Sequence, residues 1–207
     1  MDMISEERFR QEIEEARKDN IEYDPQTFHF GVPSAKETLM SGLRAVIHHD
    51  VVWLPEYDKI SEWLSNNHKK GLMIIGPPGV GKTVITMKVI PMIIHICYKR
   101  ILSCFQSTEL VNRKAYDDVM RYRNIVIDDV GIEGVYNDFG NPHMVFSEVV
   151  DNIEKRGLLL IASSNFTIEE IKTKYGLRTY DRLRAYMDLV VIKHVSLRKK
   201  NIEPSFT

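Results

Sequence analysis

GLMIIGPPGVGKT, residues 71–83, is the most informative stretch of the chain, because an apolar run passes directly into a glycine-rich loop. Residues 76–83 match the pattern G-x-x-x-x-G-K-[ST], which is typical of loops that bind nucleotide phosphates. Glycines let consecutive backbone N–H groups point at a phosphate, and the helix that follows adds the positive end of its dipole. The sequence therefore predicts a strand, a phosphate-binding loop and a helix in succession.

The loop positions have separate expected roles. Lys82 would place its ammonium group on the β- and γ-phosphates, and the hydroxyl of Thr83 would be a ligand of Mg²⁺. The residues expected to bind the nucleotide are Gly76, Pro77, Pro78, Gly79, Val80, Gly81, Lys82, Thr83 and Val84. A Gly-Pro turn without a ligand is the alternative. The strand before the loop and the helix after it favour the binding loop.

Beyond this loop, short apolar runs alternate with longer amphipathic segments. The apolar runs lie at 72–75, 101–105, 125–128, 158–163 and 189–192, with helical patterns between them at 82–99, 107–120, 142–156 and 167–174. Continuous apolar strands that alternate with helices are typical of a parallel sheet covered on both faces. The sequence thus predicts an α/β fold, namely a three-layer P-loop core with a five-stranded parallel sheet.

Two acids follow the apolar run at 125–128, in the order Asp128 and Asp129. In a P-loop protein an acid at this strand end holds Mg²⁺, and a neighbouring acid orients or deprotonates the attacking water. We therefore expect Asp128 to hold Mg²⁺ through water and Asp129 to act on the attacking water. Paired acids at a strand end also form turns, which is the alternative interpretation.

Two more features point to the same edge of the sheet. The run at 158–163 leads to Asn165, an amide at the carboxyl edge where open α/β sheets bind ligands. A cap of the helix that begins near Thr167 is the alternative role for this residue. Residues 175–184, YGLRTYDRLR, contain three arginines, and a guanidinium can stabilise the charge that develops on a transferred phosphate. A solvated helix face is the alternative there.

Taken together, these motifs resemble the AAA+ ATPases, and within them the DnaC/IstB-like family of helicase loaders and transposition helpers. The resemblance covers about residues 70–195 and rests on GPPGVGKT, IVIDDVG, IASSN and YGLRTYDRLR. It implies the strand order 5-1-4-3-2. It also implies that Asn165 is the sensor 1 residue and that Arg182 is an arginine finger, with Arg178 as the second candidate. Such fingers act on a neighbouring subunit's nucleotide, so a nucleotide-dependent homo-oligomer is implied.

The chain also departs from the wider AAA+ pattern. Asp129 stands where many of these proteins have the longer glutamate, which predicts slow hydrolysis. The segment 110–123 is short where replication loaders and initiators usually insert a helix that grips single-stranded DNA. Only about fifteen residues follow the last predicted strand, too few for a full helical lid. The missing lid agrees with the DnaC/IstB group.

Residues 1–70 form a predicted helical N-terminal extension, before an ATPase core over residues 71–207. Helices are expected at 5–18, after Ser34, and around 56–66, with Glu37 completing a capping box on Ser34. The extension could bind a partner protein. Alternatively, it could pack on the core and supply an adenine pocket through Phe28, Phe30 or Val32.

Charge and hydropathy limit the location and the partners. Lys and Arg number 28 against 29 Asp and Glu, so a basic field over the whole molecule is excluded. Residues 151–207 nevertheless carry eleven basic against seven acidic side chains, which is where DNA contact is expected. The N-terminus has no apolar signal region, and the apolar stretch 84–98 is interrupted by charge and proline. We expect a cytoplasmic protein without membrane contact.

The resemblance implies an ATPase of DNA replication, with ATP and Mg²⁺ as cofactors. It would act as a DnaC-like helicase loader, with a replicative helicase and single- or double-stranded DNA as partners. An IstB-like transposition helper, with a transposase as partner, is the alternative. A P-loop small-molecule kinase is a weaker alternative, since no lid is evident. A nucleotide-bound scaffold that hydrolyses little is the remaining one.

Overall fold

The structure, a computed structural model, describes residues 7, 10–11, 27–47, 50–138 and 140–197. Its helices there are α2 (Ala35–Val46), α3 (Glu56–Ser65), α4 (Lys82–Val84), α5 (Ile90–Tyr98), α6 (Arg113–Arg121), α7 (Val145–Arg156) and α8 (Ile168–Tyr186). A π-helical segment, η1 (Ile85–Val89), joins α4 to α5, and a 3-10 helix, η2 (Ser107–Val111), precedes α6. The helix predicted for 5–18, with its partner-binding role, lies almost wholly outside the described residues.

Five strands form one parallel sheet. They are β1 (Gly71–Ile75), β2 (Ser103–Gln106), β3 (Asn124–Asp128), β6 (Leu159–Ser164) and β7 (Met187–Val191). Their order across the sheet is β2-β3-β6-β1-β7, and every neighbouring pair is parallel. When these five strands are numbered 1 to 5 along the chain and read from β7 to β2, the order is 5-1-4-3-2, as predicted. The prediction of a five-stranded parallel α/β core is confirmed.

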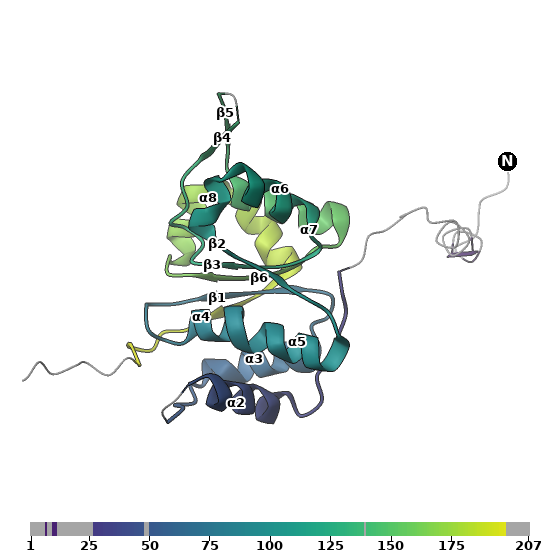
Figure 1. Ribbon diagram of the computed structural model, residues 1–207, viewed down its shortest axis with the longest axis vertical. Coiled ribbons are helices and arrows are strands. Elements are labelled where there is room, and N and C mark those ends of the chain that lie inside the picture. The colour runs from purple at the N-terminus through teal and green to yellow at the C-terminus, as the bar shows by residue number, and fades with distance from the viewer. Residues whose placement is uncertain (1–6, 8–9, 12–26, 48–49, 139, 198–207) are drawn as a thin grey trace, which may run out of the picture.

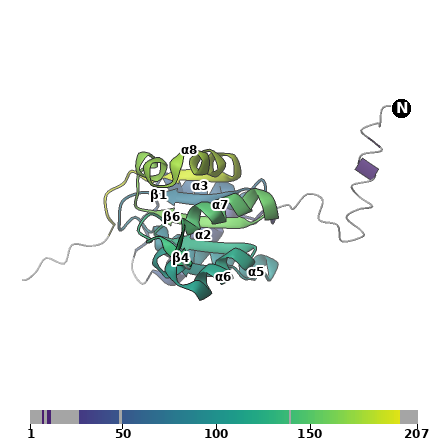
Figure 2. The ribbon, with the colours of Figure 1, turned by 90° about the horizontal axis from the view of Figure 1, so that it is seen from above.

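Alternate residues of the central strands enter two different cores, which makes the domain three-layered. Leu72 and Ile74 of β1 belong to a cluster with α2, α3 and α5. Met73 and Ile75 belong to a second cluster with α6, α7 and α8. Figure 1 shows the sheet between these two helical layers, and Figure 2 shows α6, α7 and α8 following one another across it.

The two helices before β1 form part of the first layer. Leu39 and Leu43 of α2 and Ile60 and Leu64 of α3 are fully buried in the same cluster as the strand residues. The capping box predicted at Ser34 is wrong. Ser34 has a left-handed backbone (φ 45°, ψ 49°), and its side chain makes no capping hydrogen bond. A side-chain cap requires an extended backbone at that position.

Several predicted boundaries differ from the structure. The predicted helix 142–156 begins only at α7, because a hairpin of β4 (Tyr136–Asp138) and β5 (Asn141–His143) occupies the residues before it. The predicted helix 107–120 is divided into η2 and α6. The helix predicted to end at 174 continues as α8 past a break at Gly176. The π turn of η1 ends at Val89, and Ile90 is then followed by Pro91, which has no N–H to donate into a regular α-helical ladder. None of the described helices is both long enough and apolar enough to cross a membrane.

Gly71 is required by the close approach of β1 to β6. A Cβ atom at this position would lie 2.2 Å from the carbonyl oxygen of Leu160, which belongs to a backbone that cannot easily move. We expect Gly71→Ala to lower the free energy of unfolding by about 3 kcal/mol in urea titrations. Gly134→Ala is the matched control, since its nearest contact would be a side-chain atom of Val111 at 3.4 Å. Equal losses in the two variants would contradict this prediction.

Candidate active site

The phosphate loop lies between β1 and α4, at the carboxyl edge of the sheet. Gly79 and Gly81 have φ values of 86° and 83°, a region that glycine enters without strain. The N–H of Gly76 donates to the carbonyl oxygen of Ser164 at 3.1 Å, which attaches the loop to β6. A Cβ on Gly76 would lie 2.7 Å from the carbonyl oxygen of Ile192, so only glycine fits there.

Tyr57 of α3 contacts the phosphate loop through its hydroxyl group. Its hydroxyl donates to the carbonyl oxygen of Val80 at 2.9 Å and would be 2.6 Å from a Cβ on Gly81. Burial raises the pKa of Tyr57 to about 12, so the phenol stays protonated and can donate. The role of Tyr57 could not be predicted from the sequence, because no pattern shows that a tyrosine so far before the loop contacts it.

Lys82 is the first residue of α4, directly after the glycines of the phosphate loop, and is only 5% exposed. Its ammonium group donates to the carbonyl oxygens of Gly76 and Pro77 at 2.8 and 3.0 Å. It also donates to the side-chain oxygen of Asn165 at 2.6 Å. The ammonium is therefore held by the loop and by the residue that follows β6.

Asn165 joins the lysine to the acid pair. Its amide nitrogen donates to Oδ1 of Asp129 at 2.8 Å, while its amide oxygen accepts from Lys82. The capping role belongs to Thr167 instead, which forms a capping box with Glu170 at the start of α8. Lys82, Asn165 and Asp129 thus form one series of hydrogen bonds across three elements of the chain.

The two acids at the end of β3 have different surroundings. Asp128 is 1% exposed, and its Oδ1 accepts hydrogen bonds from the hydroxyls of Ser163 and of Thr86, the latter at 3.4 Å. Asp129 has a left-handed backbone with φ 55°, which turns its side chain towards Asn165. Its N–H donates to the Ser163 hydroxyl at 3.1 Å, so one serine positions both acids.

Ser163 and Thr86 were missed by sequence analysis, although each had a signal. Thr86 lies one helical turn after Lys82, on the same side of the helix. Ser163 and Ser164 are polar residues inside an otherwise apolar strand, and both are fully buried. A buried polar side chain needs a hydrogen-bond partner. For Ser163 the partner is the carboxylate of Asp128, whereas Ser164 donates to the carbonyl oxygen of Val130.

A cavity of about 570 Å³ opens beside these residues. The polar part of its lining contains Lys82, Thr83, Asp129 and Asn165. The apolar part contains Leu43, Ile47, Val51, Val52 and Leu197. Its size and mixed lining are those of a site for a small organic ligand with a charged end.

The residues expected at an adenine pocket lie elsewhere. Phe30 and Val32 are buried in the core, and the ring of Phe28 packs edge-on against Tyr98 at 5.5 Å. None of the three lines the cavity. The apolar wall comes instead from α2, from the segment after it and from Leu197, whose N–H donates to the carbonyl oxygen of Gly79 at 2.9 Å.

Neither candidate arginine finger lines the cavity of its own chain. Arg182 donates to Oδ1 of Asp151 at 2.6 Å and to Glu154 at 3.4 Å, both on α7, and its side chain is 20% exposed. Arg178 lies 3.6 Å from the same Asp151 and is 77% exposed. The structure therefore brings the loop, Asn165 and the acids together and leaves the arginines on another surface.

The described residues fit a nucleotide with a bound metal ion. A buried ammonium and the N–H groups of the loop suit a polyphosphate, while the Thr83 hydroxyl and the Asp128 carboxylate are oxygen donors of the kind Mg²⁺ prefers. The apolar part of the cavity would accept a base.

Solved structures with a similar fold include those of DnaC, DnaI and DnaA. The DnaC helicase loader is 18% identical, with a TM-score of 0.52, over 79% of this chain and 93% of that one. DnaI is 17% identical, with a TM-score of 0.55, over 76% and 93%. This chain shares the fold of the DnaC and DnaI structures. AMPPCP-bound DnaA from Aquifex aeolicus is 15% identical, with a TM-score of 0.51, over 69% and 48%.

The fold implied by the sequence motifs is thereby confirmed. No protein-family model and no curated protein sequence matches the chain. At these identities the likeness extends to the fold, and function has to be argued from the site itself.

Proposed function

We propose that this chain binds ATP with Mg²⁺ in the cavity and hydrolyses it. The observation that carries the proposal is the series of hydrogen bonds from Lys82 through Asn165 to Asp129. It joins a phosphate-binding cation to a carboxylate that can accept a proton from water. Steady-state ATP hydrolysis by the full chain, with Mg²⁺ and with EDTA, tests this directly. An absence of magnesium-dependent turnover would contradict it.

Each residue of the site would have a separate role in binding or hydrolysis. The loop N–H groups and Lys82 would hold the phosphates, and Thr83 and Asp128 would hold Mg²⁺, which supplies positive charge beside the phosphoryl group. Asp129 would orient the attacking water and accept its proton, while Asn165 keeps that carboxylate turned into the cavity. Leu43, Ile47 and Leu197 would enclose the base.

We further propose that the ATPase serves DNA replication as a helicase loader. The support is the fold shared with two structures, DnaC and DnaI, of which the first is described as a helicase loader. The partners would be a replicative helicase and DNA. Affinity capture by the tagged chain from a mixture that contains the replicative helicase and the transposase of the same cell tests this role, and the helicase should be retained. Capture of a transposase in its place would favour the transposition helper.

An arginine from a neighbouring copy would complete the site, since neither candidate reaches the cavity of its own chain. We expect ATP turnover per subunit to rise with protein concentration, because assembly would bring the arginine to the nucleotide. At high concentration Arg182→Ala or Arg178→Ala should reduce turnover at least tenfold, while at low concentration wild type and variants should agree.

Arg184→Ala is the matched control, because Arg184 is exposed on the same helix. It should leave the concentration dependence unchanged. Turnover per subunit that is independent of concentration, with both finger variants fully active, would rule out a finger acting between subunits.

A further inference from the structure

The loop that leaves β3 points a carboxylate inward and its apolar side chains outward. The side chain of Glu133 is 3% exposed, whereas Ile132 and Val135 are 54% and 45% exposed. This is the reverse of the usual distribution, in which glutamate stays in water and aliphatic side chains are buried. Residues 131–135 are therefore held mainly by polar contacts rather than by apolar burial.

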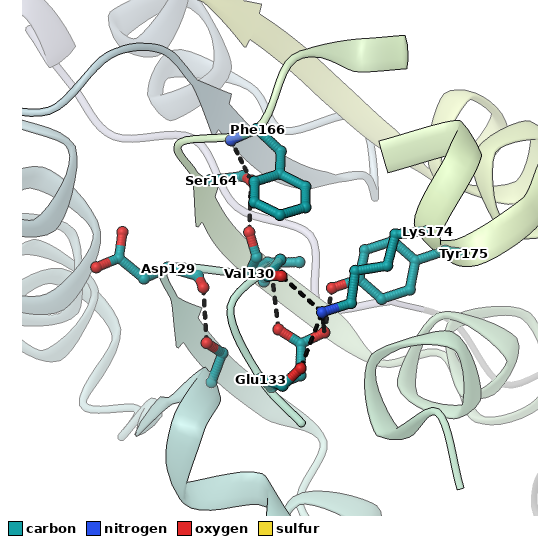
Figure 3. Close-up of polar contacts among 9 residues, drawn as sticks. Asp129, Val130, Glu133, Ser164, Phe166, Lys174 and Tyr175 are labelled. Carbon is teal, nitrogen blue, oxygen red and sulfur yellow. Dashed lines mark hydrogen bonds and ion pairs between the residues drawn. The ribbon is translucent and has the colours of Figure 1, made fainter. Parts of the chain in front are cut away.

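The buried carboxylate is satisfied by groups from two elements. It accepts hydrogen bonds from the N–H of Gly131 at 2.8 Å and from the hydroxyl of Tyr175, and it lies 3.8 Å from the ammonium of Lys174 (Figure 3). Burial and the nearby carboxylate raise the pKa of Tyr175 above its usual range, so the phenol stays protonated and donates. Glu133 thus ties its own loop to α8.

Two more contacts hold the same loop. Lys174 donates to the carbonyl oxygens of Gly131 and Glu133 at 2.6 and 2.8 Å. On the other side, the ring of Phe166 lies so close to Gly131 that a Cβ there would be 2.8 Å from the Cγ atom of Phe166. The loop consequently lies between Phe166, which follows β6, and Lys174 of α8.

The anchor on α8 is itself well fixed. Tyr175 lies in the half of the helix that begins at the Thr167 capping box and buries Ile171 in the core. The helical path breaks directly afterwards, at Gly176 with φ 82° and ψ 164°. The half that holds the loop is therefore separate from the half that carries the candidate arginine fingers.

The other end of this loop is Asp129, whose backbone is left-handed and whose carboxylate is turned to Asn165. We propose that Glu133 is a positioning residue: by fixing the loop on α8 it holds the Asp129 carboxylate where hydrolysis requires it. This role rests on the ATPase function proposed above. A displacement of about 1 Å at a reacting group can lower a rate by about a hundredfold, so the anchor matters for turnover.

Two variants of the full chain test the role. Glu133→Gln keeps the shape and an acceptor oxygen, while Glu133→Leu fills the space without any hydrogen bond. We expect kcat for ATP hydrolysis to fall about tenfold in the first and about a hundredfold in the second. The dissociation constant of ATP should stay within about twofold of wild type, since Glu133 does not line the cavity. Glu169→Gln, which changes an exposed glutamate on α8, is the control and should change neither value.

The melting temperature separates positioning from a merely structural role. Glu133→Gln keeps an acceptor oxygen for Tyr175 and Gly131, so its melting temperature should stay close to that of wild type while kcat falls. Glu133→Leu leaves both donors without an acceptor, so it should lose stability as well as turnover. Adding Glu133→Leu to Asp129→Asn should cause no further fall in kcat, because both changes remove the same contribution. Wild-type kcat in Glu133→Leu, or an ATP affinity that falls in parallel with kcat, would overturn the positioning role of Glu133. The proposed ATPase function would not be affected by either result. A wild-type chain that binds ATP without hydrolysing it would overturn the proposed ATPase function, and this role with it.

Discussion

Lys82→Ala should weaken ATP binding by about 100-fold or more, the largest loss expected from a single side chain in this site. The ammonium is buried and lies among the loop carbonyls, so in the complex its charge would meet the phosphates with little water between them. Removing one partner of such a buried charge pair costs about 3 kcal/mol or more, which is about a hundredfold in affinity. Equilibrium titration with a fluorescent ATP analogue measures the change.

The control has to separate lost charge from a damaged loop, since Lys82 also bonds to Gly76 and Pro77. Lys88→Ala removes an exposed lysine from the same helical segment and should leave affinity unchanged. The melting temperature of Lys82→Ala shows whether the loop has lost its support. Wild-type affinity in Lys82→Ala would mean that GPPGVGKT is not a phosphate-binding loop in this protein.

The sheet could be predicted from sequence because its strands are buried on both faces. A strand such as Leu159–Ser164 has no exposed side, so its apolar run is continuous and easily recognised. The β4–β5 hairpin could not be predicted in the same way. Its strands are three residues long and mostly exposed, and Pro142 lies within one of them. Short exposed strands carry little of the apolar signal on which such predictions depend.

The site was predictable where chemistry fixes the residue type and its spacing, and not where support comes from distant parts of the chain. Lys82, Asp129 and Asn165 each follow a strand or precede a helix in a recognisable pattern, and the structure brings them within hydrogen-bond distance. The apolar wall was not foreseen. Leu43 and Leu197 lie at opposite ends of the described sequence, and only the path of the chain over the sheet brings both to the cavity.

Asp129→Asn should leave ATP binding intact and reduce hydrolysis about 100-fold or more. Asparagine has the same shape, and its oxygen can still accept the hydrogen bond from Asn165, so the geometry of the site is kept. Only the ability to accept a proton from water is lost, and general-base catalysis contributes about 10²- to 10⁴-fold in enzymes. Single-turnover measurements with saturating protein report the chemical step apart from nucleotide release.

Two further variants make this result decisive. Asp181→Asn, an exposed aspartate on α8, should hydrolyse ATP as the wild type does. Asp129→Glu extends the carboxylate by one methylene towards the cavity, so it should retain turnover or raise it if the shorter side chain is what makes hydrolysis slow. Unchanged turnover in Asp129→Asn would show that this carboxylate is not the base. The protein would then be better described as a nucleotide-bound scaffold, whose ATP holds an assembly together without being consumed.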